Sequence, residues 1–295
     1  LGKVLRIDID GDGFPDFLQS DRDDKLKDSR STIKRTNKLK KVNRPLGGSF
    51  TMDYMRAGNN YLLPNNIWTL SRVDVYDGVP GDGPDRMINT FEYQNGRYDR
   101  HEREFYGFGK VITKHRDTEK GDIVYRVEEV EYLNDNFYEN GLIKSEVLKD
   151  AAGNKFTEKK NTYQLKDIHT GLNLDDIIKQ KDDGEAFPAL VKTEKLFYEG
   201  QPVAGKSTST TFNFDKLGNV TSFTDFGDPG PDDDISTAIS YHVVADKYIM
   251  DIPSSVTVSA SGKVYRQRGS TIDGNGNTIQ AQLYLEPAKI AKFDM

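Results

Sequence analysis

The chain has 295 residues and a formal net charge of −6, from 41 Lys or Arg and 47 Asp or Glu. This acidic balance argues against general nucleic-acid binding, and no apolar run reaches the roughly 18 residues that a membrane-spanning helix needs. The absence of cysteine excludes disulfides and cysteine nucleophiles, and 15 Tyr, 15 Phe and 26 Gly favour strands joined by tight turns over disorder.

The first predicted element is an acidic loop between two short strands, residues 4–7 and 17–18. Aspartates occupy positions 1, 3, 5 and 9 of this loop, and a glycine at position 6 permits a sharp turn. Carboxylates this close repel one another unless a cation gathers them, and hard oxygen ligands on a flexible loop suit Ca²⁺. We therefore predict a Ca²⁺ site; the alternative is a solvated acidic turn. The predicted ligands are Asp8, Asp10, Asp12, the backbone carbonyl of Phe14, and Asp16.

The flanks of this loop indicate which kind of calcium loop it is. A helix-loop-helix calcium hand requires a bidentate Glu at position 12, and that position is Gln19 here. With short strands on both sides, the loop resembles the calcium loop of FG-GAP/VCBS β-propeller blades. The resemblance implies that residues 1–20 are the end of one blade. Because the sequence starts almost inside the loop, we expect it to be part of a longer polypeptide.

Residues 21–44 are predicted to be a charged connector. Its second half, residues 30–44, contains seven Lys or Arg and no acidic residue. Such a run could form a surface for an anionic partner, but a solvated linker is the more economical interpretation.

From residue 45 to residue 295 the sequence predicts one repeated theme, a strand, a turn rich in Gly, Asn or Asp, and another strand. Trp68 and Leu70 alternate out of phase with Val73 and Val75, which predicts a bulge or burial on both faces. A short helix is expected around residues 174–181. The predicted strands are residues 46–54, 68–76, 87–93, 104–114, 123–132, 142–148, 155–165, 190–198, 209–214, 219–224, 239–244, 255–258, 263–268 and 278–285.

The turns between these strands share a pattern: an aromatic or apolar residue, Asp, two residues, Gly-Asn, then an apolar residue. The clearest examples are residues 212–225 and 271–279, and weaker ones are residues 149–156 and 45–50. The Asp can accept backbone N–H bonds at the start of the turn, and the glycine supplies positive φ. Turns are also expected at Asn95-Gly96 and Asn140-Gly141. Hairpins of this kind bury a face only against their neighbours, as repeat proteins do.

Two family resemblances rest on these patterns. The turn pattern is similar to the YD-repeat of Rhs proteins, with Phe214 in place of the tyrosine. Residues 68–78 and 91–109, which include Tyr98-Asp99-Arg100 and Phe105-Tyr106-Gly107-Phe108, resemble the middle region of the B component of bacterial Tc toxin complexes, shared with SpvB-like proteins. In that family, propeller blades precede this region and Rhs strands follow it. The order of elements here is the same.

The other candidates for chemistry favour structural roles. Asp99, Glu102 and Glu104, with two arginines between them, could act as acid/base groups, but charges on hairpins more often pair across strands. The histidines (His101, His115, His169 and His242) are too scattered for a metal site. Acidic loops at residues 81–85 and 227–234 could be secondary Ca²⁺ sites, although exposed acidic loops are the simpler interpretation. No catalytic residue is assigned, and we expect no enzymatic activity.

These expectations combine into one architecture. The fold class is all-β: stacked antiparallel hairpins forming a curved Rhs-like sheet, with a partial β-propeller blade at the N-terminus. The resemblance implies a structural segment of a secreted or surface-exposed bacterial virulence protein, part of a β-shell that encloses or delivers an effector polypeptide. The implied partners are the rest of its own chain, the effector and a translocation-channel protein. A cell-surface module that recognises carbohydrate or a protein partner through exposed aromatic residues is the alternative.

Overall fold

The computed structural model describes residues 3–11, 13–22, 24–33, 37–81, 83–174, 184–286 and 289–295. It divides into two units. The first comprises residues 1–135, 140–142 and 148–153, and the second comprises residues 136–139, 143–147 and 154–295.

The described residues form antiparallel strands and one short 3₁₀ turn, η1 (Ala245–Lys247). The all-β class is therefore confirmed. Of the short helix expected around residues 174–181, residues 175–181 lie outside the described residues. No helix within the described ranges has the length and apolar character needed to cross a membrane.

The first unit begins with a small sheet of three antiparallel strands, β1 (Lys3–Ile7), β2 (Asp16–Arg22) and β3 (Lys25–Ser29). Strand β3 lies inside the predicted connector of residues 21–44, so that boundary is too early. All five residues of β3 are exposed, so no apolar alternation marks the strand in the sequence. It is held by its pairing with β2 and by an exposed Lys27–Asp21 ion pair at 3.8 Å.

A second sheet of the first unit contains strands that pair in chain order. They are β4 (Lys41–Asn43), β5 (Ser49–Ala57), β6 (Ile67–Tyr76), β7 (Arg86–Asp99), β8 (Glu104–Asp117) and β9 (Ile123–Tyr132). The predicted break in phase on β6 is a bulge. Asp53 pairs with Arg72 and Tyr54 pairs with Leu70, so Ser71 has no residue opposite it. Because of this extra residue, the alternation of side chains changes phase at Ser71 while β6 stays paired with β5 on both sides of it.

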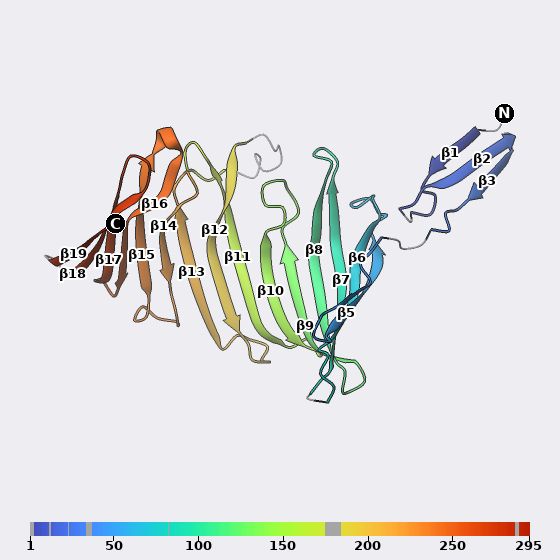
Figure 1. The fold of residues 1–295 in the computed structure, drawn as a ribbon, viewed down its shortest axis with the longest axis horizontal. Helices are drawn as coiled ribbons and strands as arrows, with labels where there is room; N and C mark the ends of the chain where they lie inside the picture. The colour runs from blue at the N-terminus through green and yellow to red at the C-terminus, as the bar shows by residue number, and fades with distance from the viewer. Residues whose placement is uncertain are drawn as a thin grey trace. The chain divides into compact units, whose positions relative to one another are not determined.

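The expected turn at Asn95-Gly96 is wrong, because both residues lie inside β7. Asn95 has φ +55°, and the pairing with β8 shifts its register just after Gly96. A Cβ on Gly96 would lie 2.6 Å from the Leu63 side chain, so this position needs glycine for close packing. The hairpin turn is instead made by residues 100–103 (Figure 1). The packing of Leu63, more than thirty positions earlier in the chain, thus determines that Gly96 lies in a strand rather than in a turn.

In the second unit, the strands again pair with their chain neighbours as antiparallel hairpins (Figure 1). Strand β10 (Ile143–Asp150) is divided between the two units. The others are β11 (Lys155–Asp167), β12 (Ala186–Phe197), β13 (Lys206–Phe214), β14 (Val220–Asp225), β15 (Ile235–Val244), β16 (Ile249–Ala260), β17 (Lys263–Ile272), β18 (Thr278–Glu286) and β19 (Lys289–Asp294). The sequence did not predict β19.

The two clearest predicted turns have the same geometry. In the first, the carboxylate of Asp215 accepts hydrogen bonds from Leu217 N (2.9 Å), Asn219 N (2.9 Å) and Asn219 Nδ2 (3.0 Å). In the second, Asp273 accepts the equivalent bonds from Asn275 N (2.8 Å) and from Asn277 N and Nδ2 (both 2.9 Å). The predicted role of the turn aspartate is therefore confirmed.

The same backbone turn recurs at the weaker matches. Gly47 N donates to Arg44 O at 3.1 Å and Gly153 N to Asp150 O at 3.2 Å, as Gly218 N does to Asp215 O at 3.3 Å. Where Arg44 replaces the aspartate, the backbone turn persists without a carboxylate to bind it. The glycine is therefore the common requirement, and the aspartate adds hydrogen bonds to it.

Replacing Asp215 with Ala should destabilise the second unit by about 1–2 kcal/mol, because three donors lose a shared acceptor. Urea unfolding, followed by near-ultraviolet circular dichroism, measures the change. Asp228→Ala is the control, since that exposed aspartate pairs with Lys206 at 2.5 Å on the surface and should matter little. Equal losses in the two variants would contradict a specific role for the turn.

Candidate functional site

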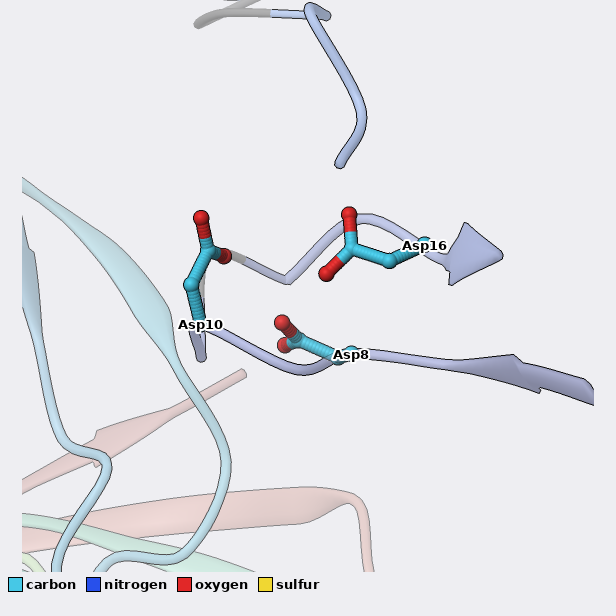
Figure 2. A group of neighbouring side chains, drawn as sticks. All are labelled: Asp8, Asp10 and Asp16. Atoms are coloured by element: carbon cyan, nitrogen blue, oxygen red, sulfur yellow. The ribbon is translucent and has the colours of Figure 1, made fainter. Parts of the chain in front are cut away.

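Three of the predicted ligands come together between β1 and β2. Asp8 follows the end of β1, Asp16 begins β2, and Asp10 lies in the loop that joins these strands. Each offers a carboxylate oxygen, and these oxygens all lie within 4.8 Å of one another. Figure 2 shows the three carboxylates turned toward a common space. Within the described ranges, no other group of three metal-ligating side chains meets this spacing.

Asp16 is the buried member of the group, with no exposed surface, whereas Asp8 and Asp10 are exposed. Its Oδ1 accepts a hydrogen bond from Ser31 N at 2.7 Å and its Oδ2 accepts one from Ile9 N at 2.8 Å. The Ser31 and Ile9 amides lower the pKa of Asp16, so the carboxylate is held in its charged form. The loop therefore keeps its negative charge on a fixed side chain.

The loop backbone supports the same arrangement. Gly13 N donates to Asp8 Oδ2 at 2.8 Å, and Gly13 has φ +80°, a conformation that favours glycine. This agrees with the turn that the sequence predicts at position 6. Phe14 lies between Gly13 and Asp16 in this loop. Asp12, the remaining predicted ligand, lies outside the described residues.

A cationic side chain reaches the edge of the acidic loop. Arg30 Nη1 lies 3.9 Å from Asp10 Oδ2, while Arg30 Nε donates to Asp28 Oδ2 at 3.0 Å. Both aspartates raise the pKa of Arg30, Asp28 more than Asp10. Part of the loop charge is thus balanced by the chain itself, from a residue that follows β3.

The three carboxylates fit the coordination chemistry of Ca²⁺. Oxygen ligands lie about 2.3–2.6 Å from this ion, so two ligands on opposite sides of it are about 5 Å apart. The observed limit of 4.8 Å meets that requirement. The Asp16 carboxylate accepts backbone N–H bonds from Ser31, Ile9 and Asp10, and because a carboxylate offers about four acceptor positions, it keeps capacity for an ion. Ca²⁺ takes six to eight oxygens, so the loop backbone and water would complete its coordination.

The charge cluster after Tyr98 is a hairpin turn. Asp99 Oδ1 accepts hydrogen bonds from His101 N at 2.9 Å and from Glu102 N at 2.8 Å. Arg100 Nη2 donates to Tyr61 O at 3.0 Å and its guanidinium lies 4.5 Å from the Tyr61 ring centre. These contacts agree with the structural role expected for the cluster.

The four histidines lie apart from one another, as the sequence indicates. Their ring nitrogens contact Glu102 (from His101, 3.1 Å), Glu128 (from His115, 3.2 Å), Glu185 (from His169, 2.7 Å) and Ser270 O (from His242, 2.9 Å). In the acidic loops, Asp85 Oδ1 accepts from Gly81 N at 2.9 Å, and Asp233 Oδ2 accepts from Asp228 N at 2.8 Å. Asp82 lies outside the described residues.

Sequence reasoning missed the partly buried ion pairs of the first unit. Glu129 contacts Lys110 Nζ and Lys149 Nζ, each at 2.6 Å. Burial opposes ionisation of Glu129, but the hydrogen bonds from Lys110 and Lys149 outweigh it and lower the pKa. Alternating Lys and Glu on neighbouring strands is a signal for such pairs, but their partners depend on strand register.

Comparison with known proteins first supports the fold. The chain superposes with a TM-score of 0.67 and 12% identity on the crystal structure of TcdB2-TccC3 without its hypervariable C-terminal region, covering 96% of this chain and 20% of that chain. The superposition on the crystal structure of TcdB2-TccC3-Cdc42 has a TM-score of 0.66 and 12% identity, and it covers 96% of this chain and 20% of that chain. The superposition on the structure of the Photorhabdus luminescens Tc holotoxin pore with the TccC3-D651A mutation has a TM-score of 0.66 and 12% identity. It covers 96% of this chain and 19% of that chain. The chain thus spans about a fifth of the solved chains it matches.

A sequence family model also matches part of the chain. Residues 3–138 match the model described as insecticide toxin TcdB middle/N-terminal region. No match was found among curated protein sequences. The family match includes the Tyr98-Asp99-Arg100 and Phe105-to-Phe108 motifs, and together with the fold it supports the predicted relationship to the B component of Tc toxins.

Proposed function

We propose that this chain is a structural segment of the wall of a Tc-toxin-like shell, and that it acts as scaffold rather than enzyme. The observation that carries the proposal is the scarcity of buried apolar side chains. Only five hydrophobic residues are buried among those described: Leu63, Ile88, Tyr106, Leu165 and Ala189. A domain that folded around its own core would bury many more, because two packed layers normally enclose one.

The exposed surface supports the same conclusion. Large hydrophobic side chains on the described strands are exposed, among them Leu26, Met87 and Tyr265. Among the described strands, extensive contacts join only neighbours in the sheet order. A wall one sheet thick has this property, since its faces meet the enclosed space and the outside rather than a second layer.

By analogy with the solved complexes, the partners would be a TccC3-like polypeptide that carries an effector and a channel protein of the holotoxin, in a secreted complex. The recurrent Asp-x-x-Gly-Asn turns would be degenerate YD-repeats of this wall. The three-stranded sheet of residues 3–29 would be part of an FG-GAP/VCBS-like propeller blade that precedes the wall.

Electron cryomicroscopy of the full polypeptide that contains this chain, co-expressed with a TccC3-like partner, tests the wall. We expect a hollow particle in which residues 41–294 form a single layer of strands. A second layer of protein packed over both faces of this sheet would contradict the proposal.

We also propose that the loop formed by Asp8, Asp10 and Asp16 binds Ca²⁺, with Asp12 and the carbonyl of Phe14 as further ligands. The convergence of three carboxylates on one space supports this assignment. The ion would hold the ends of β1 and β2 together and take no part in catalysis. Through Ser31 N, which donates to Asp16, it would also fix the path by which the chain leaves the small sheet.

Calcium should slow hydrogen exchange at the amides of Ile9, Gly13 and Ser31, which donate to the ligand carboxylates. At about 100 times the dissociation constant, binding should slow exchange about 100-fold, and EGTA should reverse this. Mass spectrometry of peptic peptides measures the effect. Asp8→Asn with Asp10→Asn should abolish it, and Asp228→Asn should not. Equal exchange with CaCl₂ and with EGTA would refute the calcium site.

A further inference from the structure

The two faces of the sheet in the second unit differ sharply from β13 to β19. On one face, two cross-strand rows run side by side. The first row is Phe212, Phe223, Thr237, Val258 and Arg266, and the second is Ile239, Val256, Arg268, Leu283 and Ala291. The rows are adjacent because their members on β15, β16 and β17 are two residues apart. We call these ten residues the apolar-arginine face.

The opposite face carries neutral polar groups at the neighbouring positions. One of its rows is Thr211, Thr224, Ser236 and Ser259, and another includes Asn213, Ser222, Thr257 and Gln267. Its side chains hydrogen-bond across strands, with Thr224 Oγ1 and Ser236 Oγ 3.0 Å apart and Asn213 Nδ2 donating to Ser222 Oγ at 2.9 Å. Four of these polar side chains are therefore paired with one another across strands.

The apolar-arginine face has two cations without a counter-charge. Arg266 and Arg268 are exposed, and neither side chain makes a hydrogen bond or ion pair with any described residue. They stand opposite Val258 and Val256, so two guanidinium groups project from apolar surroundings. None of the ten residues of this face is acidic, and Asp225 lies opposite Ile235 at the end of the face. The local charge is therefore positive, although the whole chain carries −6.

A hollow lies along β17 and β18 beside Arg266, and its lining also includes Gln267 and Tyr284, which the strand register places on the opposite face. It has a volume of about 640 Å³ and is lined by seven residues, among them Val264, Tyr265 and Leu285. Tyr265 is 65% exposed and Leu285 is 55% exposed, so apolar groups are presented to solvent next to the guanidinium. Exposed apolar surface beside arginine and aromatic side chains is characteristic of protein-binding hot spots.

We propose that the apolar-arginine face binds an extended polypeptide segment in which apolar side chains alternate with carboxylates. The apolar rows would cover the apolar side chains, and the arginines would pair with carboxylates through their two-pronged donors. Alternation suits an extended segment because its side chains point to opposite sides with a period of two. This proposal goes beyond the role of wall, since it assigns one face a ligand and the other none.

Fluorescence polarisation with short labelled peptides tests the proposal on the intact chain. Three peptides share the same Phe, Leu and Val positions and alternate them with Glu, Lys or Ser. We expect the Glu peptide to bind about tenfold more tightly than the other two. This preference opposes the net charge of the chain, so long-range attraction cannot produce it. Equal binding of the three peptides, or binding of none, overturns the proposal.

Two matched variants locate the interaction. Arg266→Gln with Arg268→Gln should weaken binding of the Glu peptide about tenfold and remove most of its salt dependence. Lys292→Gln removes a positive charge from the opposite face of β19 and should leave the affinity unchanged. Equal losses in the two variants would overturn the assignment to this face. If the preference for the Glu peptide is lost because the chain associates with itself, the face binds a second copy of the chain instead. Analytical ultracentrifugation detects this self-association.

Discussion

Replacing Leu63 with Ala lowers the free energy of unfolding of the first unit by about 2–4 kcal/mol, the expected cost of a cavity at a buried leucine. Leu63 is 1% exposed, and its side chain fills the space that the missing Cβ of Gly96 leaves open. The loop that carries it is held to β7, because Tyr98 N donates to Leu62 O at 2.8 Å. We therefore expect the surrounding residues to fill little of the cavity that Leu63→Ala leaves.

The neighbouring residue provides the control for this prediction. Leu62 is 55% exposed, and its contact with Tyr98 uses the backbone, so Leu62→Ala should cost less than about 0.5 kcal/mol. Urea unfolding with tryptophan fluorescence follows both variants, since Trp68 lies on β6 of the same unit. Similar losses at the two positions would show that the loop does not anchor the hairpin through Leu63.

Most of the strands could be predicted because their signals are local. The bulge on β6 was visible as a phase change between Leu70 and Val73, and the turns at Asp215 and Asp273 were visible as an aspartate spaced from Gly-Asn. Both kinds of signal lie within a few residues of the structure they specify. Sequence reading succeeds where the determinant is this close.

The errors share the opposite property. Asn95-Gly96 has the composition of a turn, but Leu63 packs over Gly96 and the chain continues as a bulged strand. Strand β3 has no apolar residue on a buried face, so nothing in its composition distinguishes it from a linker. In both cases the deciding contact is made by another segment of the chain.

The acidic loop shows the same division. The spacing of its aspartates predicted the convergence of Asp8, Asp10 and Asp16, because a tight loop brings alternate residues together. The burial of Asp16 under Ser31 N, and the approach of Arg30 to Asp10, depend on the pairing of β2 with β3. Strand β3, which the sequence did not reveal, therefore completes the surroundings of the acidic loop, which the sequence did predict.

Replacing Asp74 with Asn should lower the free energy of unfolding of the first unit by about 2–3 kcal/mol at pH 7. Asp74 is 7% exposed and binds two arginines: Arg72 donates through Nε at 2.5 Å and through Nη2 at 3.1 Å, and Arg86 donates through Nη2. Removing one member of a buried ion pair costs about 3–5 kcal/mol, and the partial exposure of the arginines, 33% and 34%, reduces this.

The control is Asp135→Asn, which makes the same chemical change at an exposed pair. Asp135 is 81% exposed and lies 2.9 Å from Arg97 Nη1, so its loss should cost less than about 1 kcal/mol. Thermal or urea unfolding at constant ionic strength compares the two variants. If Asp135→Asn costs as much as Asp74→Asn, burial does not determine the strength of these pairs.

The pH dependence of the Asp74 effect gives a second, independent check. Burial disfavours the charged form of Asp74, but hydrogen bonds from Arg72 and Arg86 outweigh it and lower the pKa below the usual value of 3.8. A group with a lowered folded-state pKa stabilises the protein above its unfolded pKa, and this contribution is lost as the pH falls through the folded value. The wild type should therefore lose its advantage over Asp74→Asn below about pH 4. An advantage that stays constant down to pH 2 would mean that the charge of Asp74 does not stabilise the sheet.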